Sequence, residues 1–322
     1  MTPASTVFPD KFASIEELRK TYIRTPRDEM FRLHLDRLLK RGTDGCSLPE
    51  PVRFTATGET RGIALVEGPS GGKTSLVHHV LSKHPALQTD DPMRMLWIGV
   101  RVPRPATLKS LGLEVLRQSG YPHASASRKE WDIWCLVRDR LRTLGTVVLW
   151  IDEAHDLFRA GKAYQIEDIL KMLKSIMQGD GAVIVVLTGV DTLWKIASYD
   201  DQVKRRYSKV TLPPVSSSKD EKALLGVIHH FSRQVGLEVD LSHDIVERLV
   251  HASRNRFGRC IENIVAALET AVLQGANGLD IQHFAEAWAM QEGCDRGKNV
   301  FLSPQWAQID MSAPEANSRG LA

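Results

Sequence analysis

Residues 63–76 constrain the fold of this chain more than any other stretch, because they read Ile-Ala-Leu-Val-Glu-Gly-Pro-Ser-Gly-Gly-Lys-Thr-Ser-Leu. The four apolar residues 63–66 are typical of a central strand in a parallel sheet. The glycine-rich stretch that follows lets the backbone turn its N–H groups toward one point, and a helix begins there. Strand, loop and helix together predict a site for the phosphate groups of ATP or GTP.

Single positions of this loop predict distinct contacts. Lys73 supplies a cation for the β- and γ-phosphates, and Thr74 supplies a hydroxyl for Mg²⁺. The other residues expected to line the phosphates are Gly68, Pro69, Ser70, Gly71, Gly72 and Ser75. Glu67 stands where the common spacing has its first glycine. We therefore expect the loop conformation, rather than the ligand, to differ from the common pattern.

Apolar runs alternate with helical patterns in the middle of the chain. Strands are expected at about 63–66, 95–100, 146–151, 182–187 and 210–212, and helices at about 73–83, 107–119, 128–144 and 162–178. This alternation is typical of crossover connections in a parallel sheet with helices on both faces. The sequence therefore predicts an α/β nucleotide-binding domain over residues 61–214.

Three further segments flank this domain. Residues 1–60 are expected to form an N-terminal helical segment, with helices over about 14–22 and 30–41 and a loop over 42–60. Residues 215–291 carry helical patterns only, which predicts a small all-α lid domain. Residues 292–322 are rich in Gly, Ser, Pro and Asn and are expected to be a mostly flexible tail.

Composition excludes several classes of protein. Lys and Arg total 42 against 39 Asp and Glu, a net charge of +3, so a nucleic-acid surface would have to come from local clustering. The four cysteines lie far apart without a C-x-x-C pair, which argues against a disulfide framework or a zinc site. No apolar run approaches the roughly 20 residues that span a bilayer, and the N-terminus lacks a signal-peptide pattern. We expect a cytoplasmic protein with no membrane partner.

Two adjacent carboxylates end the apolar run that starts at residue 147. The carboxyl tips of strands in such a sheet lie beside the phosphate loop. Asp152 is therefore expected to hold Mg²⁺ together with Thr74, and Glu153 to orient and activate the attacking water. The alternative is a solvated acidic turn. Thr188, at the end of the next strand, is expected to sense the γ-phosphate, the alternative being an ordinary strand-end threonine.

Arginines at two places are candidates for contact with the phosphates. Arg205 and Arg206 precede the last strand and could provide an arginine finger to a neighbouring subunit's nucleotide. The sequence does not choose between them, and a solvated basic turn is the alternative. Arg259 in the all-α domain could reach the phosphates from the lid. Arg256 is its substitute, and a surface salt bridge is the other interpretation.

A basic loop follows the second expected strand. Arg101, Arg104 and Lys109 in this loop are candidates for contacts with the phosphate backbone of DNA. Pro103 and Pro105 also suit an ordinary strand-to-helix connection, so a solvated loop is the alternative.

The order of phosphate loop, Asp-Glu strand tip, threonine-ended strand, paired arginines and lid arginine resembles that of AAA+ ATPases. Within that class, four stretches resemble the TniB/TnsC group of transposition regulators: residues 22–27, 152–157, 187–190 and 257–261. The resemblance covers about residues 10–290. It implies a protein that assembles with ATP and Mg²⁺ on double-stranded DNA as a ring or filament of its own copies. It also implies recruitment of a DDE transposase, a target-selection protein as partner, and disassembly controlled by ATP hydrolysis.

Two rival functions use the same motifs. A helicase loader or motor would show fast, DNA-stimulated turnover with strand displacement. A nucleotide-gated scaffold for proteins would not bind DNA in any nucleotide state. The stretch Asp-Glu-Ala-His at residues 152–155 resembles the box of a helicase class, but those helicases carry two α/β domains and this chain has room for one.

Overall fold

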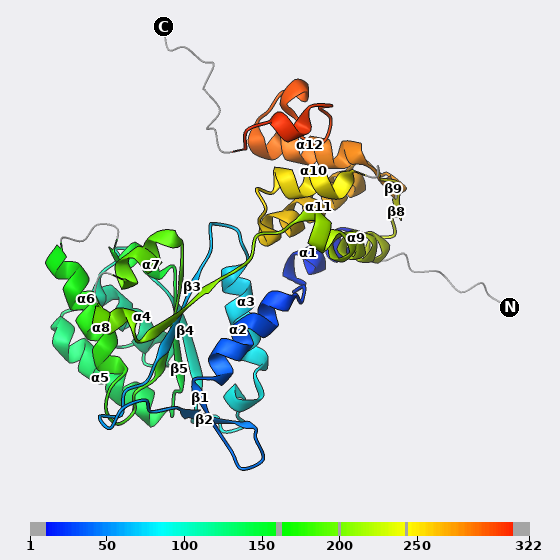
Figure 1. The fold of residues 1–322 in the computed structure, drawn as a ribbon. Helices are drawn as coiled ribbons and strands as arrows, with labels where there is room; N and C mark the ends of the chain where they lie inside the picture. Colours follow the sequence, from blue (N-terminus) through cyan, green and yellow to red (C-terminus); the bar gives the residue numbers. More distant parts are fainter. Residues whose placement is uncertain (1–10, 159–162, 199–200, 242–243, 312–322) are drawn as a thin grey trace, which may run out of the picture. The chain divides into compact units, whose positions relative to one another are not determined.

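The computed structural model describes residues 11–158, 163–198, 201–241 and 244–311. The chain divides into two compact units (Figure 1). The α/β unit is Ile23–Pro213, and the helical unit joins the residues up to Tyr22 with those from Pro214 onward. The expected N-terminal segment 1–60 is therefore not one unit, because its first helix belongs to the helical unit.

The α/β unit is built on a five-stranded sheet in the order β4-β5-β6-β3-β7, with all strands parallel. The strands are β3 (Gly62–Val66), β4 (Trp97–Arg101), β5 (Val148–Asp152), β6 (Ile184–Gly189) and β7 (Tyr207–Thr211). The predicted fold class is thus confirmed. Strand β6 lies between the strand that enters the phosphate loop and the strand that ends in Asp152.

Helices cover both faces of this sheet (Figure 1). Successive strand residues face opposite sides, so Ile63 and Leu65 pack in one buried cluster and Ala64 in the other. The first cluster includes α2 (Pro26–Asp36), α3 (Lys73–Lys83) and η1 (Pro85–Leu87). The second includes α4 (Leu108–Gln118), α5 (Glu130–Thr143), η2 (Ala154–Phe158), α6 (Ala163–Ile176) and α7 (Asp191–Ala197). The short helix α8 (Asp201–Lys204) precedes β7.

The region before the sheet differs from the prediction. Helix α2 begins at Pro26, behind the N-cap Thr25, because proline suits the first turn of a helix. It ends at Asp36, and residues 39–41 form β1 (Leu39–Arg41) rather than a last helical turn. Strand β1 pairs antiparallel with β2 (Ser47–Pro51), inside the expected loop. The apolar residues Leu38 and Leu39 are buried in the same cluster as α2, and this burial decided their path.

The helical unit contains four longer helices in about the range that was predicted to be all-α. They are α9 (Ser217–Gln234), α10 (Ile245–Ala252), α11 (Phe257–Leu273) and α12 (Ile281–Glu292). A short parallel pair, β8 (Glu238–Val239) and β9 (Gly278–Leu279), was not predicted. Helix α1 (Lys11–Lys20) packs against α11, where Arg19 Nη2 lies 2.6 Å from Glu269 Oε2.

Part of the expected flexible tail is packed. Residues from Arg296 to Gln308 include the short helices η3 (Arg296–Lys298) and η4 (Trp306–Gln308). Val300 and Phe301 are buried, and Arg248 Nη1 donates to the carbonyls of Val300 and Ser303. Two buried apolar side chains and the hydrogen bonds from the half-buried Arg248 hold this segment, so the flexible-tail prediction is wrong for it; residues 312–322 lie outside the described residues. Among the described helices, none has the length and apolar character to cross a membrane.

Candidate nucleotide site

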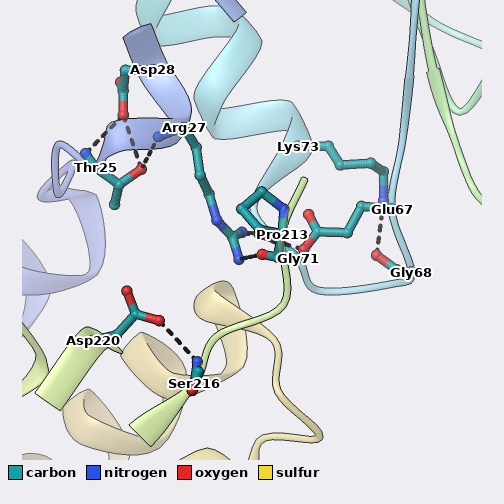
Figure 2. Close-up of polar contacts among 10 residues, drawn as sticks. All are labelled: Thr25, Arg27, Asp28, Glu67, Gly68, Gly71, Lys73, Pro213, Ser216 and Asp220. Carbon is teal, nitrogen blue, oxygen red and sulfur yellow. Dashed lines mark hydrogen bonds and ion pairs between the residues drawn. The ribbon is translucent and has the colours of Figure 1, made fainter. Parts of the chain in front are cut away.

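The phosphate loop has the backbone geometry that its sequence predicts. Strand β3 ends at Val66 and α3 begins at Lys73. Ser70 and Gly72 have positive φ angles of 55° and 93°, which turn the chain sharply before the helix. The N-cap is Gly72, so no side chain caps the first N–H groups of α3, and these remain available to an anion. Lys73 is buried, and its Nζ donates to the Gly68 carbonyl at 3.1 Å (Figure 2).

Asp152 gathers two hydroxyls from different elements. Thr74 Oγ1, on the first turn of α3, donates to Asp152 Oδ2 at 2.9 Å. Thr188 Oγ1, near the end of β6, donates to Asp152 Oδ1. Both Asp152 and Thr188 are buried. The carboxylate and hydroxyl oxygens of Asp152 and Thr74 are the ligands that Mg²⁺ prefers, so the predicted donor set fits that ion.

Glu153 is held in an uncommon backbone conformation. It directly follows β5 and has a φ of 52°, in the left-handed region that few residues other than glycine adopt. Strain of this kind concentrates at functional sites. The side chain is 25% exposed, and its Oε2 lies 3.2 Å from His155 Nδ1. The carboxylate is therefore open to solvent beside a buried one that is fully engaged.

The sheet brings these groups to one edge. Val66 pairs with Gly189, and Ile151 pairs with Leu187, so β3, β5 and β6 end together. The loop, Asp152, Glu153 and Thr188 consequently lie at the carboxyl edge, where open α/β sheets bind ligands. This placement is consistent with the prediction that the loop, the two carboxylates and Thr188 lie close together.

Arg205 and Arg206 lie at the opposite, amino edge, because the Arg206 carbonyl accepts from the N–H of Gly62 at the start of β3. Arg206 is buried, and its Nη2 donates to Glu59 Oε1 at 2.6 Å. The Arg205 side chain is 64% exposed and lies 3.8 Å from Glu59 Oε2. Burial raises the pKa of the Tyr207 phenol, which lies beside Arg206. The two arginines thus have different environments.

Arg259 lies in the first turn of α11 in the helical unit. Its Nη2 is 3.8 Å from Glu292 Oε1. The same carboxylate accepts hydrogen bonds from Arg254 Nη1 at 3.1 Å and Nη2 at 3.0 Å. Arg259 is thus the more weakly held of the two guanidinium groups. Arg256 is the N-cap residue of the same helix.

The basic loop follows the edge strand β4. Arg101 pairs in register with Asp152, which places the start of the loop at the carboxyl edge. Arg101 and Arg104 are exposed, and Lys109 is half-buried on the first turn of α4. Within the described part of the chain, none of the three forms an ion pair.

Two contributors to the site were missed from the sequence. Trp150 had no role assigned from the sequence, but its Nε1 donates to Thr188 Oγ1 at 3.1 Å and so fixes the hydroxyl that donates to Asp152. Arg27 had no assigned role, although it lies in one of the stretches that resemble transposition regulators. Its side chain reaches the phosphate loop, where Nη1 lies 3.2 Å from Glu67 Oε1 and 3.2 Å from the Gly71 carbonyl (Figure 2). The only sequence signal was the unusual Glu67, which is buried and therefore demands a cation.

Several solved structures have a similar fold. The Cdc6p structure from Pyrobaculum aerophilum has a TM-score of 0.59 at 13% identity, over 87% of this chain and 74% of that one. The ORC2 protein of Aeropyrum pernix, in ADPNP and ADP complexes, has a TM-score of 0.54 at 17% identity, over 76% of this chain and 68% of that one. Drosophila ORC bound to DNA has a TM-score of 0.55 at 14% identity, over 92% of this chain and 72% of that one. These likenesses confirm the AAA+ fold. No curated protein sequence matches the chain.

A sequence model of one protein family covers most of the α/β unit. The family is described as "Bacterial TniB protein", and its match runs over residues 50–217, just over half of the 322 residues. The matched stretch contains the phosphate loop, the Asp152–Glu153 strand tip, Thr188 and the two arginines before β7. The chain therefore belongs to the TniB family of AAA+ ATPases.

Proposed function

We propose that this protein is an ATP-dependent regulator of DNA transposition. It assembles on duplex DNA as a ring or filament of its own copies, recruits and activates a DDE transposase, engages a target-selection protein, and disassembles through ATP hydrolysis. The observation that carries the nucleotide part is the convergence of Thr74 and Thr188 on Asp152 beside the phosphate loop. Membership of the TniB family supports the transposition part.

The roles in hydrolysis follow from the carboxyl edge. Lys73 would hold the β- and γ-phosphates, and the N–H groups of residue 68 and of residues 70–75 would surround them. Thr74 and Asp152 would hold Mg²⁺, which neutralises charge on the phosphates when bound. Glu153 accepts the proton of the attacking water. Thr188 contributes through Asp152, because its hydroxyl is committed to that carboxylate.

The remaining arginines are assigned by their burial. We assign the arginine finger to Arg205, since the Arg206 guanidinium is buried and bonded to Glu59. Arg205 is exposed at the edge opposite its own phosphate loop, so it would serve the nucleotide of a neighbouring copy. Arg259 is proposed as the lid arginine, with Glu292 as its partner when no phosphate is bound.

DNA contacts are assigned to Arg101, Arg104 and Lys109. A chain with a net charge of +3 cannot hold a duplex by overall charge, so a small basic surface repeated by oligomerisation has to supply the attraction. One structure of the same fold, Drosophila ORC, was solved bound to DNA, and this supports a DNA-binding role. Because each copy offers few charges, binding should require ATP.

The test is fluorescence anisotropy with duplex DNA across a salt series, with and without a non-hydrolysable ATP analogue. We expect ATP-dependent binding whose log K falls with log salt at a slope of about −0.9 per phosphate neutralised. Replacing Arg101, Arg104 and Lys109 together by alanine should abolish DNA binding and leave ATP binding intact. The matched control replaces three cations that already pair with carboxylates: Lys40, Arg117 and Arg142.

Several outcomes would contradict the proposal. An unchanged salt slope in the triple variant would place the DNA surface elsewhere. Absence of DNA binding by the wild type in every nucleotide state would favour a protein scaffold, and strand displacement with fast turnover would favour a motor. The partner assignment is tested by co-purification with a DDE transposase from the same mobile element, with and without the ATP analogue.

A further inference from the structure

Arg27 occupies a buried position at the start of α2. Thr25 caps this helix, and its N–H donates in return to Asp28 Oδ2 at 2.8 Å, which fixes the entry of the chain. Pro26 takes the first helical position, so Arg27 points from a rigid turn. Its side chain is only 8% exposed. The guanidinium therefore enters the interior in one defined direction, toward the phosphate loop (Figure 2).

Glu67, at the base of the loop, forms an ion pair with this guanidinium. The Glu67 side chain is 1% exposed and stands where the common motif has its first glycine. Its carboxylate packs against Gly71 so closely that a Cβ there would meet the carboxylate at 2.0 Å. Arg27 Nη1 also donates to the Gly71 carbonyl at 3.2 Å. One ion pair thus supports two points of the loop, directly before the glycine that opens α3.

The other end of the same guanidinium holds the connection between the two units. Arg27 Nη2 donates to the carbonyl of Pro213, the last residue of the α/β unit. Two residues later, the Val215 N–H donates to the Asn255 carbonyl at 2.9 Å, and Asn255 Nδ2 donates back to the Val215 carbonyl at 2.9 Å. Pro214 alone separates these two anchored points. Asn255 in turn precedes α11, which carries Arg259.

We propose that Arg27 is a positioning residue that couples the phosphate loop to the Pro213–Val215 connection. Anion binding at the loop N–H groups fixes the peptide of Gly71. Because Arg27 donates to the carbonyls of both Gly71 and Pro213, it then restricts the movement of Pro213 and of the chain that leads into the helical unit. A buried ion pair is a costly way to fill space, and it is best attested where it fixes one arrangement among several. The guanidinium suits this task because its planar fork binds several acceptors at once. This inference rests on the proposed ATP function.

The test combines a fluorescent ATP analogue with hydrogen exchange. Pro213 and Pro214 carry no N–H, so the reporting amides are those of Val215 and Ser216. Because Arg27→Met alone removes the cation beside a buried carboxylate, the main variant is Arg27→Met/Glu67→Gln, which removes both charges while Met remains unbranched and Gln keeps the shape of Glu. Arg27→Lys retains the charge without the fork. The control is Arg32→Met in the same helix, whose side chain is 49% exposed and lies 3.6 Å from Asp36.

We expect ATP to slow exchange at Val215 and Ser216 in the wild type and in Arg32→Met. In the double variant this protection should be lost and ATP affinity should fall at least about tenfold, since one charged hydrogen bond corresponds to about a decade in an equilibrium constant. Arg27→Lys should rescue part of the affinity but little of the protection. Wild-type affinity or retained protection in the folded double variant would overturn the inference. Failure of the wild type to bind ATP would instead overturn the proposed function beneath it.

Discussion

The carboxylate of Asp152 accepts hydrogen bonds from Thr74 and Thr188, and Thr188 accepts one from Trp150. Three elements, α3, β5 and β6, thereby fix one acidic group. The neighbouring Glu153 is different, because its side chain is partly exposed and its backbone has the left-handed φ of 52°. In the proposed function these two adjacent carboxylates have separate tasks, Asp152 holding a metal and Glu153 activating water.

Glu153→Gln should keep ATP bound while blocking its cleavage, because only the water-activating carboxylate is neutralised. A lost general base typically costs about 10²–10⁴ in rate. We expect a loss of that size in phosphate release, unchanged affinity for an ATP analogue, and longer-lived assemblies on DNA. Asp156→Asn is the matched control, since Asp156 contacts the other nitrogen of His155 at 3.5 Å. Turnover equal to wild type in Glu153→Gln would contradict the role.

At the scale of elements, helix α9 combines a buried apolar face with one glycine that lowers the stability of the helix. Leu224, Ile228 and Phe231 are buried along one face. Gly226 lies in the middle of the helix on the exposed side, and a Cβ built there would meet nothing within 4 Å. Glycine in a helix interior loses more backbone entropy on folding than alanine does. The position therefore lowers the stability of the helical unit without a packing reason.

Gly226→Ala should stabilise the protein by about 0.5–1 kcal/mol, because it removes backbone freedom from the unfolded chain without strain in the folded one. Urea unfolding followed by circular dichroism measures this as a higher midpoint at unchanged slope. ATP turnover should stay at the wild-type level. A lower midpoint would mean that the open space around Gly226 is used by a contact between copies.

For the whole molecule, the two edges of the sheet divide the chemistry. The carboxyl edge carries the phosphate loop and Asp152, whereas the amino edge carries the exposed Arg205. A group at one edge cannot serve its own loop at the other, so in the proposed function a complete site requires a second copy. Oligomerisation and hydrolysis are therefore linked in the proposed function.

Mixing Arg205→Ala protein with Lys73→Ala protein should partly restore ATP hydrolysis. Each variant supplies what the other lacks at one interface, and an arginine finger is typically worth about 10³–10⁵ in rate. Phosphate release across mixing ratios should pass through a maximum. Lys204→Ala, which changes an exposed neighbour, should be active alone. If the two variants co-assemble and no ratio restores activity, Arg205 is not the finger.

Local sequence determined the nucleotide-binding half of this fold. The apolar run 63–66, the glycines and Lys73 encode strand, loop and helix within fourteen residues, and the strand that ends in Asp152 is equally local. Helix α3 spans Lys73–Lys83 as predicted. These features were predictable because periodicity, glycine conformations and strand ends depend on near neighbours in the chain.

Tertiary structure alone decided which distant residues meet. Arg27 pairs with Glu67 forty residues later, and α1 packs against α11 from the other end of the chain. Burial separated Arg206 from Arg205, which the sequence treats alike, and it ordered Val300 and Phe301 in a segment whose composition indicated flexibility. Such pairings depend on the path of the whole chain. Which charges and which apolar side chains become buried, and the free energy that this costs or contributes, therefore depends on the complete fold.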